Sequence, residues 1–134
     1  MYDVLIIGAG PAGMTAAIYA ARAGHKTAIV EYGVPGGQAA TTDMIENYPG
    51  FPQGISGPEL MIKFFEQTQT FGVEMIYEQV QSMELTQEIK KITTNMQTIE
   101  AKVVVIASGA KPKLLGIPNE NQMRGKGVSY CATC

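Results

Sequence analysis

The sequence predicts an α/β fold in three layers, with a central parallel sheet and a small antiparallel β-meander. Two observations indicate this class. Within the first 31 residues, two continuous apolar runs flank a helix-length segment, as in a parallel βαβ unit whose strands are covered on both faces. Residues 79–100 alternate weakly between apolar and polar side chains and have no helix-length apolar stripe, which favours antiparallel strands with exposed turns.

A strand is expected over residues 2–7, then a glycine turn, then a helix over residues 11–23. Pro11 suits the first helical turn, where a missing N–H costs nothing, and Gly24 suits the position that ends the helix. A second buried strand over residues 27–31 completes a βαβ unit of about thirty residues.

Residues 32–57 are rich in glycine and proline and are predicted to be mostly loop, which at this length indicates a functional segment. Ser56 and Glu59 then match a capping box that opens a helix, and Gly72 ends it. A strand over residues 73–77 follows. The helix is expected to place five apolar side chains on one face: Leu60, Met61, Phe64, Phe65 and Phe71.

After the meander, residues 103–107 form a continuous apolar run and are predicted to be another buried strand, which ends at Ser108 and Gly109. Residues 111–118 contain two prolines and are predicted to be an extended linker that leaves the first domain. The chain therefore divides into a domain over residues 1–110, a linker over 111–118 and the start of a second domain over 119–134.

Composition and charge exclude several functions. The chain has 134 residues, of which 46% are hydrophobic and 16% charged, so one ordered core is expected. A net charge of -2 with scattered lysines gives no basic surface for nucleic acid. The N-terminus has no basic region, and its apolar run is too short for a signal peptide or a membrane span, so a cytoplasmic protein is expected.

A glycine-rich turn follows the first predicted strand, with the sequence Gly8-Ala9-Gly10-Pro11-Ala12-Gly13. In a dinucleotide-binding turn, Gly8 would make the bend, Gly10 would admit the pyrophosphate and Gly13 would let helix and strand pack closely. Glu31, at the end of the second strand, would bind the ribose hydroxyls. This pattern does not distinguish FAD from NAD, and a plain structural turn is the simpler alternative.

The two cysteines of the chain are Cys131 and Cys134, in a Cys-x-x-Cys pattern. In a reducing cytosol this spacing favours a redox dithiol, in which one thiolate attacks and its neighbour later displaces the mixed disulfide. Zinc is the alternative. It needs four ligands, and beyond the cysteines the chain offers a single histidine, His25, so no metal site is expected.

Several motifs together resemble those of the low-molecular-weight thioredoxin reductases, a family of pyridine nucleotide-disulfide oxidoreductases. The resemblance covers nearly the whole chain. Its motifs occur in family order and are the glycine turn at residues 8–13, Gly36-Gly37-Gln38, the run Ile45-Glu46-Asn47-Tyr48-Pro49-Gly50-Phe51, the turn Ala107-Ser108-Gly109-Ala110, and Cys131-Ala132-Thr133-Cys134. The chain has Ser108 where threonine is commoner in the family, which keeps the hydroxyl group.

The resemblance implies a Rossmann-like FAD-binding domain over residues 1–110, incomplete at its C-terminal end, and the start of an NADPH and redox-disulfide domain over 119–134. The catalytic pair would be Cys131 and Cys134. The residues implied to bind FAD are Gly8, Gly10, Pro11, Ala12, Gly13, Glu31, Gly36, Gly37, Gln38, Asn47, Val80, Ala107, Ser108 and Gly109.

The resemblance also implies that the whole protein passes electrons from NADPH through FAD and the Cys-x-x-Cys pair to thioredoxin, and that it forms a homodimer. Family members are about twice as long as this chain. Their NADPH site and the last segment of their FAD domain follow the Cys-x-x-Cys, so this chain is expected to be their N-terminal part and to be inactive alone. Two alternatives stay open: a reductase that takes electrons from ferredoxin or another donor, and a non-catalytic flavin-binding fragment.

Overall fold

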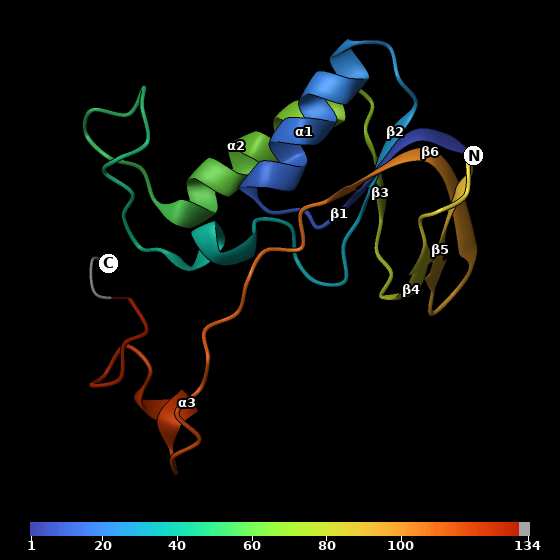
Figure 1. Cartoon of the computed structure of the whole chain (residues 1–134). Helices are drawn as coiled ribbons and strands as arrows, with labels where there is room; N and C mark the ends of the chain where they lie inside the picture. Colours follow the sequence, from blue (N-terminus) through green and yellow to red (C-terminus); the bar gives the residue numbers. More distant parts are fainter. Residues whose placement is uncertain (132–134) are drawn as a thin grey trace.

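The computed structural model describes residues 1–131 and places one mixed β-sheet at the centre of the main domain. Two helices, α1 (Pro11–Arg22) and α2 (Gly57–Thr70), lie side by side over one face of this sheet (Figure 1). The strand order is β3-β2-β1-β6-β5-β4. The strands are β1 (Tyr2–Ile7), β2 (Thr27–Val30), β3 (Glu74–Ile76), β4 (Val80–Glu84), β5 (Lys90–Thr94) and β6 (Thr98–Ile106).

The parallel and antiparallel parts of the sheet are joined through β6. Near its start β6 pairs antiparallel with β5, and from Ala101 onward it pairs parallel with β1. Ala101 itself lies opposite both Lys90 and Tyr2. The sequence pattern predicts the end of the meander and residues 103–107 as separate strands. They are one strand, because a single extended segment satisfies two different partners along its length.

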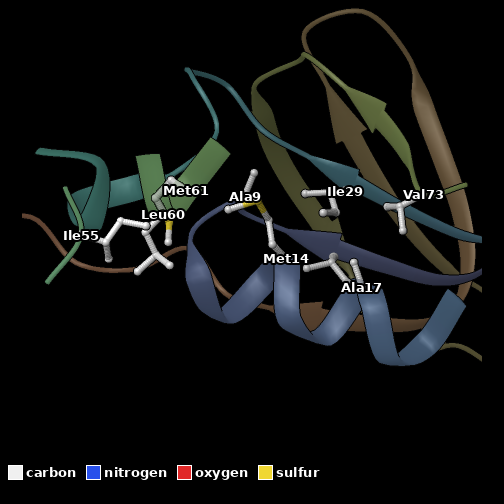
Figure 2. Packing of buried hydrophobic residues seen from close by; sticks show 9 residues of the cluster. Ala9, Met14, Ala17, Ile29, Ile55, Leu60, Met61 and Val73 are labelled. Atoms are coloured by element: carbon white, nitrogen blue, oxygen red, sulfur yellow. The ribbon is translucent and has the colours of Figure 1, made fainter. Parts of the chain in front are cut away.

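Two apolar clusters fill the spaces on either side of the parallel strands. The first lies under the helices and includes Met14, Ile29 and Leu60, each almost completely buried (Figure 2). The second lies on the opposite face, where Leu5 of β1 packs with Ile92 of the meander. The meander therefore covers the face that the helices leave open, which confirms the predicted three layers.

The helix ends agree with the signals in the sequence. Gly24 has a positive φ of 86° after the last turn of α1, and Gly72 has a φ of 71° after α2. At the start of α2, the Ser56 hydroxyl accepts a hydrogen bond of 3.3 Å from the Glu59 N–H. Phe71 does not join the apolar face as predicted. It caps the C-terminus of α2, is 38% exposed, and lies under the Arg22 guanidinium at 5.8 Å.

The segment at residues 32–57, predicted to be mostly loop, contains a short 3-10 helix, η1 (Gly37–Thr41), that no sequence pattern indicates. Five residues of 3-10 helix have no long periodic pattern by which they could be recognised. An isolated bridge between Ile45 and Ile55 closes the rest of the segment into a loop before α2.

The strand predicted at residues 103–107 is present as the second half of β6, but the prediction that it is buried is wrong at two of its positions. Val103 is 51% exposed and Ile106 is 55% exposed. The reason is the pairing of β6, because β5 accompanies it no further than the Lys90–Ala101 pair. Beyond Ala101, within the part of the chain that the structure describes, β6 has β1 on one side and no strand on the other.

Residues after Gly109 leave the sheet and form a separate arm (Figure 1). Residues 111–117 have neither helix nor strand, and the arm then contains one short helix, α3 (Glu120–Met123), followed by a bridge between Arg124 and Val128. None of the helices within residues 1–131 is both long and apolar enough to span a membrane.

Candidate dinucleotide and redox site

The carboxyl ends of β1, β2 and β6 lie at the same edge of the sheet, because these strands are parallel neighbours. The segments that follow them, together with the start of η1, surround a cavity of about 530 Å³, here called the dinucleotide cavity. Its lining includes most of the residues predicted from the sequence: Gly8, Gly10, Pro11, Ala12, Glu31, Gly37, Gln38, Ala107, Ser108 and Gly109. Val34, Ala39, Ala110 and Lys111 complete it.

Each glycine of the turn has a separate structural reason. Gly8 has a φ of 104°, and a Cβ there would lie 2.4 Å from the Ala107 carbonyl oxygen. A Cβ on Gly13 would lie 1.9 Å from the Gly8 carbonyl oxygen, so α1 can pack this closely on β1 only through glycine. Gly10 differs, because the nearest atom to its Cβ position is the Gly37 Cα at 4.0 Å. The space beside Gly10 is the cavity itself.

The N-terminus of α1 opens into the dinucleotide cavity. Its N-cap residue is Gly10, which has no side chain to cap the first N–H groups, and Pro11 occupies the first turn. Uncapped N–H groups and the helix dipole make such a terminus favourable for an anion. A pyrophosphate would therefore satisfy donors that the protein leaves open, and the residues present fit a dinucleotide.

Glu31 closes the opposite side of the turn. Its carboxylate accepts hydrogen bonds from the Ala9 N–H at 2.8 Å and the Gly33 N–H at 2.7 Å. A carboxylate has about four lone-pair positions, so two bonds leave capacity for further donors such as ribose hydroxyls. Because Glu31 also lines the cavity, it can hold the turn and face a ligand at the same time.

The Gly36-Gly37-Gln38 motif brings η1 against the glycine turn. The Gly36 N–H donates to the Ala9 carbonyl oxygen at 2.7 Å, and the φ of Gly36 is 127°. Gly36 does not line the dinucleotide cavity but shapes the turn beside it. The Gln38 side-chain amide donates to the Ala110 carbonyl oxygen, which ties η1 to the start of the arm.

A second cavity of about 540 Å³, here called the redox cavity, lies between the loop after η1 and the arm. Gln38 lines both cavities, so the two adjoin. On one wall lie Thr41, Thr42, Asp43 and Met44, and on the other lie Pro112, Arg124, Gly125, Val128, Ser129, Tyr130 and Cys131. Sequence reasoning selected only Gln38 and Cys131 among these. Sequence position was the signal available for the others. Residues 41–44 follow the Gly36-Gly37-Gln38 motif, and residues 124–130 precede the Cys-x-x-Cys motif.

Cys131 is placed at the end of the arm by its neighbour Ser129. The Ser129 hydroxyl donates to the Cys131 carbonyl oxygen at 2.9 Å, and the Cys131 N–H donates back to the same hydroxyl oxygen at 3.3 Å. Cys134 lies outside the described residues. Within residues 1–131, no group of three or more potential ligands could hold a metal ion.

Four predicted cofactor residues do not line either cavity: Gly13 and Gly36 belong to the turns beside the dinucleotide cavity, and Asn47 and Val80 lie elsewhere. Asn47 lines a smaller cavity of about 290 Å³ in the loop before α2, together with Tyr48 and Phe51. Val80 begins β4, pairs with Thr94 and packs against the second apolar cluster. Their contact with a cofactor stays a prediction.

The model of the family described as pyridine nucleotide-disulphide oxidoreductase matches residues 2–134. A thioredoxin reductase of Bacillus subtilis is 48% identical over 134 residues, which are 100% of this chain and 42% of that protein. The chain thus spans less than half the length of the curated relatives it matches.

Solved structures give the same similarity. The crystal structure of thioredoxin reductase from Streptococcus pyogenes is 54% identical with a TM-score of 0.91, covering 100% of this chain and 44% of that one. A thioredoxin reductase of Lactococcus lactis is 49% identical with a TM-score of 0.86, covering 100% and 44%. A ferredoxin-flavin thioredoxin reductase from Clostridium acetobutylicum is 33% identical with a TM-score of 0.75, covering 99% and 46%.

Proposed function

The chain belongs to the pyridine nucleotide-disulphide oxidoreductase family, and from this premise we propose that the whole protein is an FAD-dependent thioredoxin reductase. One observation carries the proposal. The dinucleotide cavity and the redox cavity adjoin through Gln38, and Cys131 lies on the wall of the second. A long cofactor with a nucleotide at one end and a redox-active ring at the other fits this arrangement.

In this proposal the protein holds FAD through groups already in place. The N-terminus of α1 receives the pyrophosphate, and Glu31 accepts hydrogen bonds from the ribose. Gln38 and the segment from Ala107 to Gly109 line the same cavity and would contact the rest of the cofactor. When bound, the flavin supplies two-electron chemistry between a hydride donor and a disulfide. The protein's part is to orient it and to bring a disulfide to it.

The disulfide is proposed to be that of Cys131 and Cys134. In the reduced state one thiolate attacks a sulfur of the thioredoxin disulfide, and the second cysteine then displaces the thioredoxin. The two cysteine thiols lose two electrons and two protons as their S–S bond forms. The thioredoxin disulfide gains the same two electrons and two protons. The balance needs no further reactant in this half of the cycle.

The electron donor is proposed to be NADPH, bound outside residues 1–134 in the whole protein, which we also propose to be a cytoplasmic homodimer. The description of the matching family model, pyridine nucleotide-disulphide oxidoreductase, supports this donor, and the relatives named thioredoxin reductase are 48–54% identical to this chain. The ferredoxin-flavin reductase of Clostridium acetobutylicum, at 33% identity, keeps a ferredoxin donor as the second candidate.

The test is an anaerobic assay of the whole protein with FAD and oxidised thioredoxin, in which NADPH, NADH and reduced ferredoxin are offered separately. The proposal expects thioredoxin thiols to appear with NADPH at a rate far above the other two donors. A Cys131→Ser variant should lose thioredoxin reduction and keep its bound FAD. Reduction by ferredoxin alone would replace NADPH with the second candidate. No thioredoxin thiols with any donor would reject the function and favour a non-catalytic flavin-binding protein.

A further inference from the structure

Glu120 is a buried carboxylate in the arm, far in sequence from the glycine turn. It has no part in the cofactor binding or the thiol exchange proposed above. Its residue is only 6% exposed. A buried carboxylate is unfavourable unless hydrogen bonds replace its water. Four hydrogen bonds to the Glu120 carboxylate replace that water.

Three backbone N–H groups of the linker converge on this carboxylate. The Leu115 N–H donates to Oε2 at 3.0 Å, and the N–H groups of Gly116 and Ile117 donate to Oε1 at 2.8 and 3.4 Å. The fourth donor is the hydroxyl of Tyr130, which binds Oε2. One side chain therefore joins the start of the arm to the residue immediately before Cys131.

The aromatic ring of Tyr130 makes a second contact within the arm. The Arg124 guanidinium lies 5.3 Å from the ring centroid, which is within the range of a cation–π contact. The Glu120 carboxylate raises the pKa of Tyr130, and the Tyr130 hydroxyl lowers the pKa of Glu120. The phenol thus remains a donor and the carboxylate an acceptor around neutral pH. Arg124, Tyr130 and Cys131 all line the redox cavity, so this contact shapes one of its walls.

We propose that Glu120 is a positioning residue for the dithiol, holding Cys131 on the wall of the redox cavity through the hydroxyl of Tyr130. This inference rests on the proposed function for its catalytic consequence, but the positional claim stands on the contacts alone. Glu120 does not touch the reacting atoms. Its effect passes through the Tyr130 side chain to the adjoining peptide of Cys131, which Ser129 also holds.

The experiment uses the whole FAD-loaded protein and four variants. Tyr130→Phe removes the hydroxyl and keeps the ring under Arg124, while Glu120→Gln removes the charge and one acceptor. The double variant closes a mutant cycle. Tyr77→Phe is the matched control, because Tyr77 is 58% exposed and lies between β3 and β4, outside the arm.

Two readouts are taken: kcat and KM for thioredoxin, and amide hydrogen exchange of the peptide that ends at Cys131, with and without FAD. Each single variant should lower kcat about tenfold, leave KM within a factor of about two, and speed exchange about tenfold. The double variant should be no worse than either single one, and the control should match the wild type. Full flavin occupancy shows that the fold is intact.

The proposal is overturned by unchanged exchange in the single variants, by additive effects in the double variant, or by a rise in KM with unchanged kcat. The last result would place Glu120 in thioredoxin docking. If the wild type reduces no thioredoxin, the proposed function fails and hydrogen exchange alone decides the positional claim. Unchanged exchange would then reject it, and faster exchange would support it.

Discussion

The carboxylate of Glu31 accepts a hydrogen bond from the backbone N–H of Ala9 at 2.8 Å. The acid at the end of β2 therefore holds the glycine turn at the end of β1, in addition to facing the cavity. A second bond from the Gly33 N–H fixes the chain where it leaves the sheet. The residue proposed to bind the ribose also orders the turn that receives the pyrophosphate.

Glu31→Gln should weaken FAD binding about tenfold or more, because one carboxylate oxygen is replaced by an amide that cannot accept from a backbone N–H. The free energy of unfolding should fall by about 1–3 kcal/mol for the same reason. Flavin titration and chemical denaturation measure the two effects. Glu84→Gln, on an exposed part of β4, is the control. Unchanged affinity in Glu31→Gln would contradict its role in the cavity.

Gly10→Val should abolish the bound flavin and leave the fold intact. A Cβ at Gly10 has its nearest neighbour at 4.0 Å, so a valine fits the protein but fills the path of the pyrophosphate. Gly13→Val should instead unfold the protein, since its Cβ would lie 1.9 Å from the Gly8 carbonyl oxygen. Flavin absorbance and thermal unfolding distinguish the two variants. Full flavin occupancy in Gly10→Val would show that the dinucleotide binds elsewhere.

Cys131 and Cys134 should behave as one reversible dithiol in the whole protein. Mild reduction should produce two thiols together, with no intermediate in which one has appeared alone, because the second cysteine resolves the mixed disulfide. Thiol titration against the potential of a redox buffer measures this. Stoichiometric zinc released only when the thiols are alkylated would show a metal site instead.

The contact between Glu120 and Tyr130 should have a defined pH window. The Tyr130 hydroxyl is the first cause of the lowered pKa of Glu120, so the stabilisation is complete above the ordinary value of 4.5 and is lost as pH falls through the lower pKa of the folded state. Glu120 raises the pKa of Tyr130, so this contribution is complete below 10.0 and lost as pH rises through the higher folded value. The backbone amide shifts of Leu115 and Gly116 in NMR spectra should report the acid limit. A midpoint at or above 4.5 in the wild type would contradict it.

Residues 1–134 expressed alone should bind FAD much more weakly than the whole protein and should not reduce thioredoxin with NADPH. Val103 and Ile106 on β6 are about half exposed. Within residues 1–131, the part of β6 after Ala101 pairs with β1 on one side and with no strand on the other. Such an edge leaves the wall of the cavity unsupported. Flavin content and NADPH oxidation, measured on both forms, test this. Turnover by residues 1–134 at the rate of the whole protein would refute it.

The local parts of the fold and site could be read from the sequence because short-range chemistry decides them. Gly24 and Gly72 end helices by adopting positive φ, and Ser56 caps α2 through a residue three positions away. Within the turn at residues 8–13, Gly13 must be glycine because a Cβ there would lie 1.9 Å from the carbonyl oxygen of Gly8 in the same turn. Periodicity separated the helices from the meander for the same reason, since burial of one face imposes a fixed repeat.

Contacts between distant segments were decided only by the tertiary structure. No local pattern shows that β6 is shared by two partners or that Val103 lies exposed, because both depend on where β5 stops pairing. The cavity wall opposite Cys131 comes from a loop about ninety residues earlier in the chain. The role of Glu120 depends on its hydrogen bond with the Tyr130 hydroxyl, which only the folded arm brings together. No sequence motif marks Glu120 or Tyr130. Their interaction becomes important because packing removes water from the carboxylate and places the Tyr130 hydroxyl beside it.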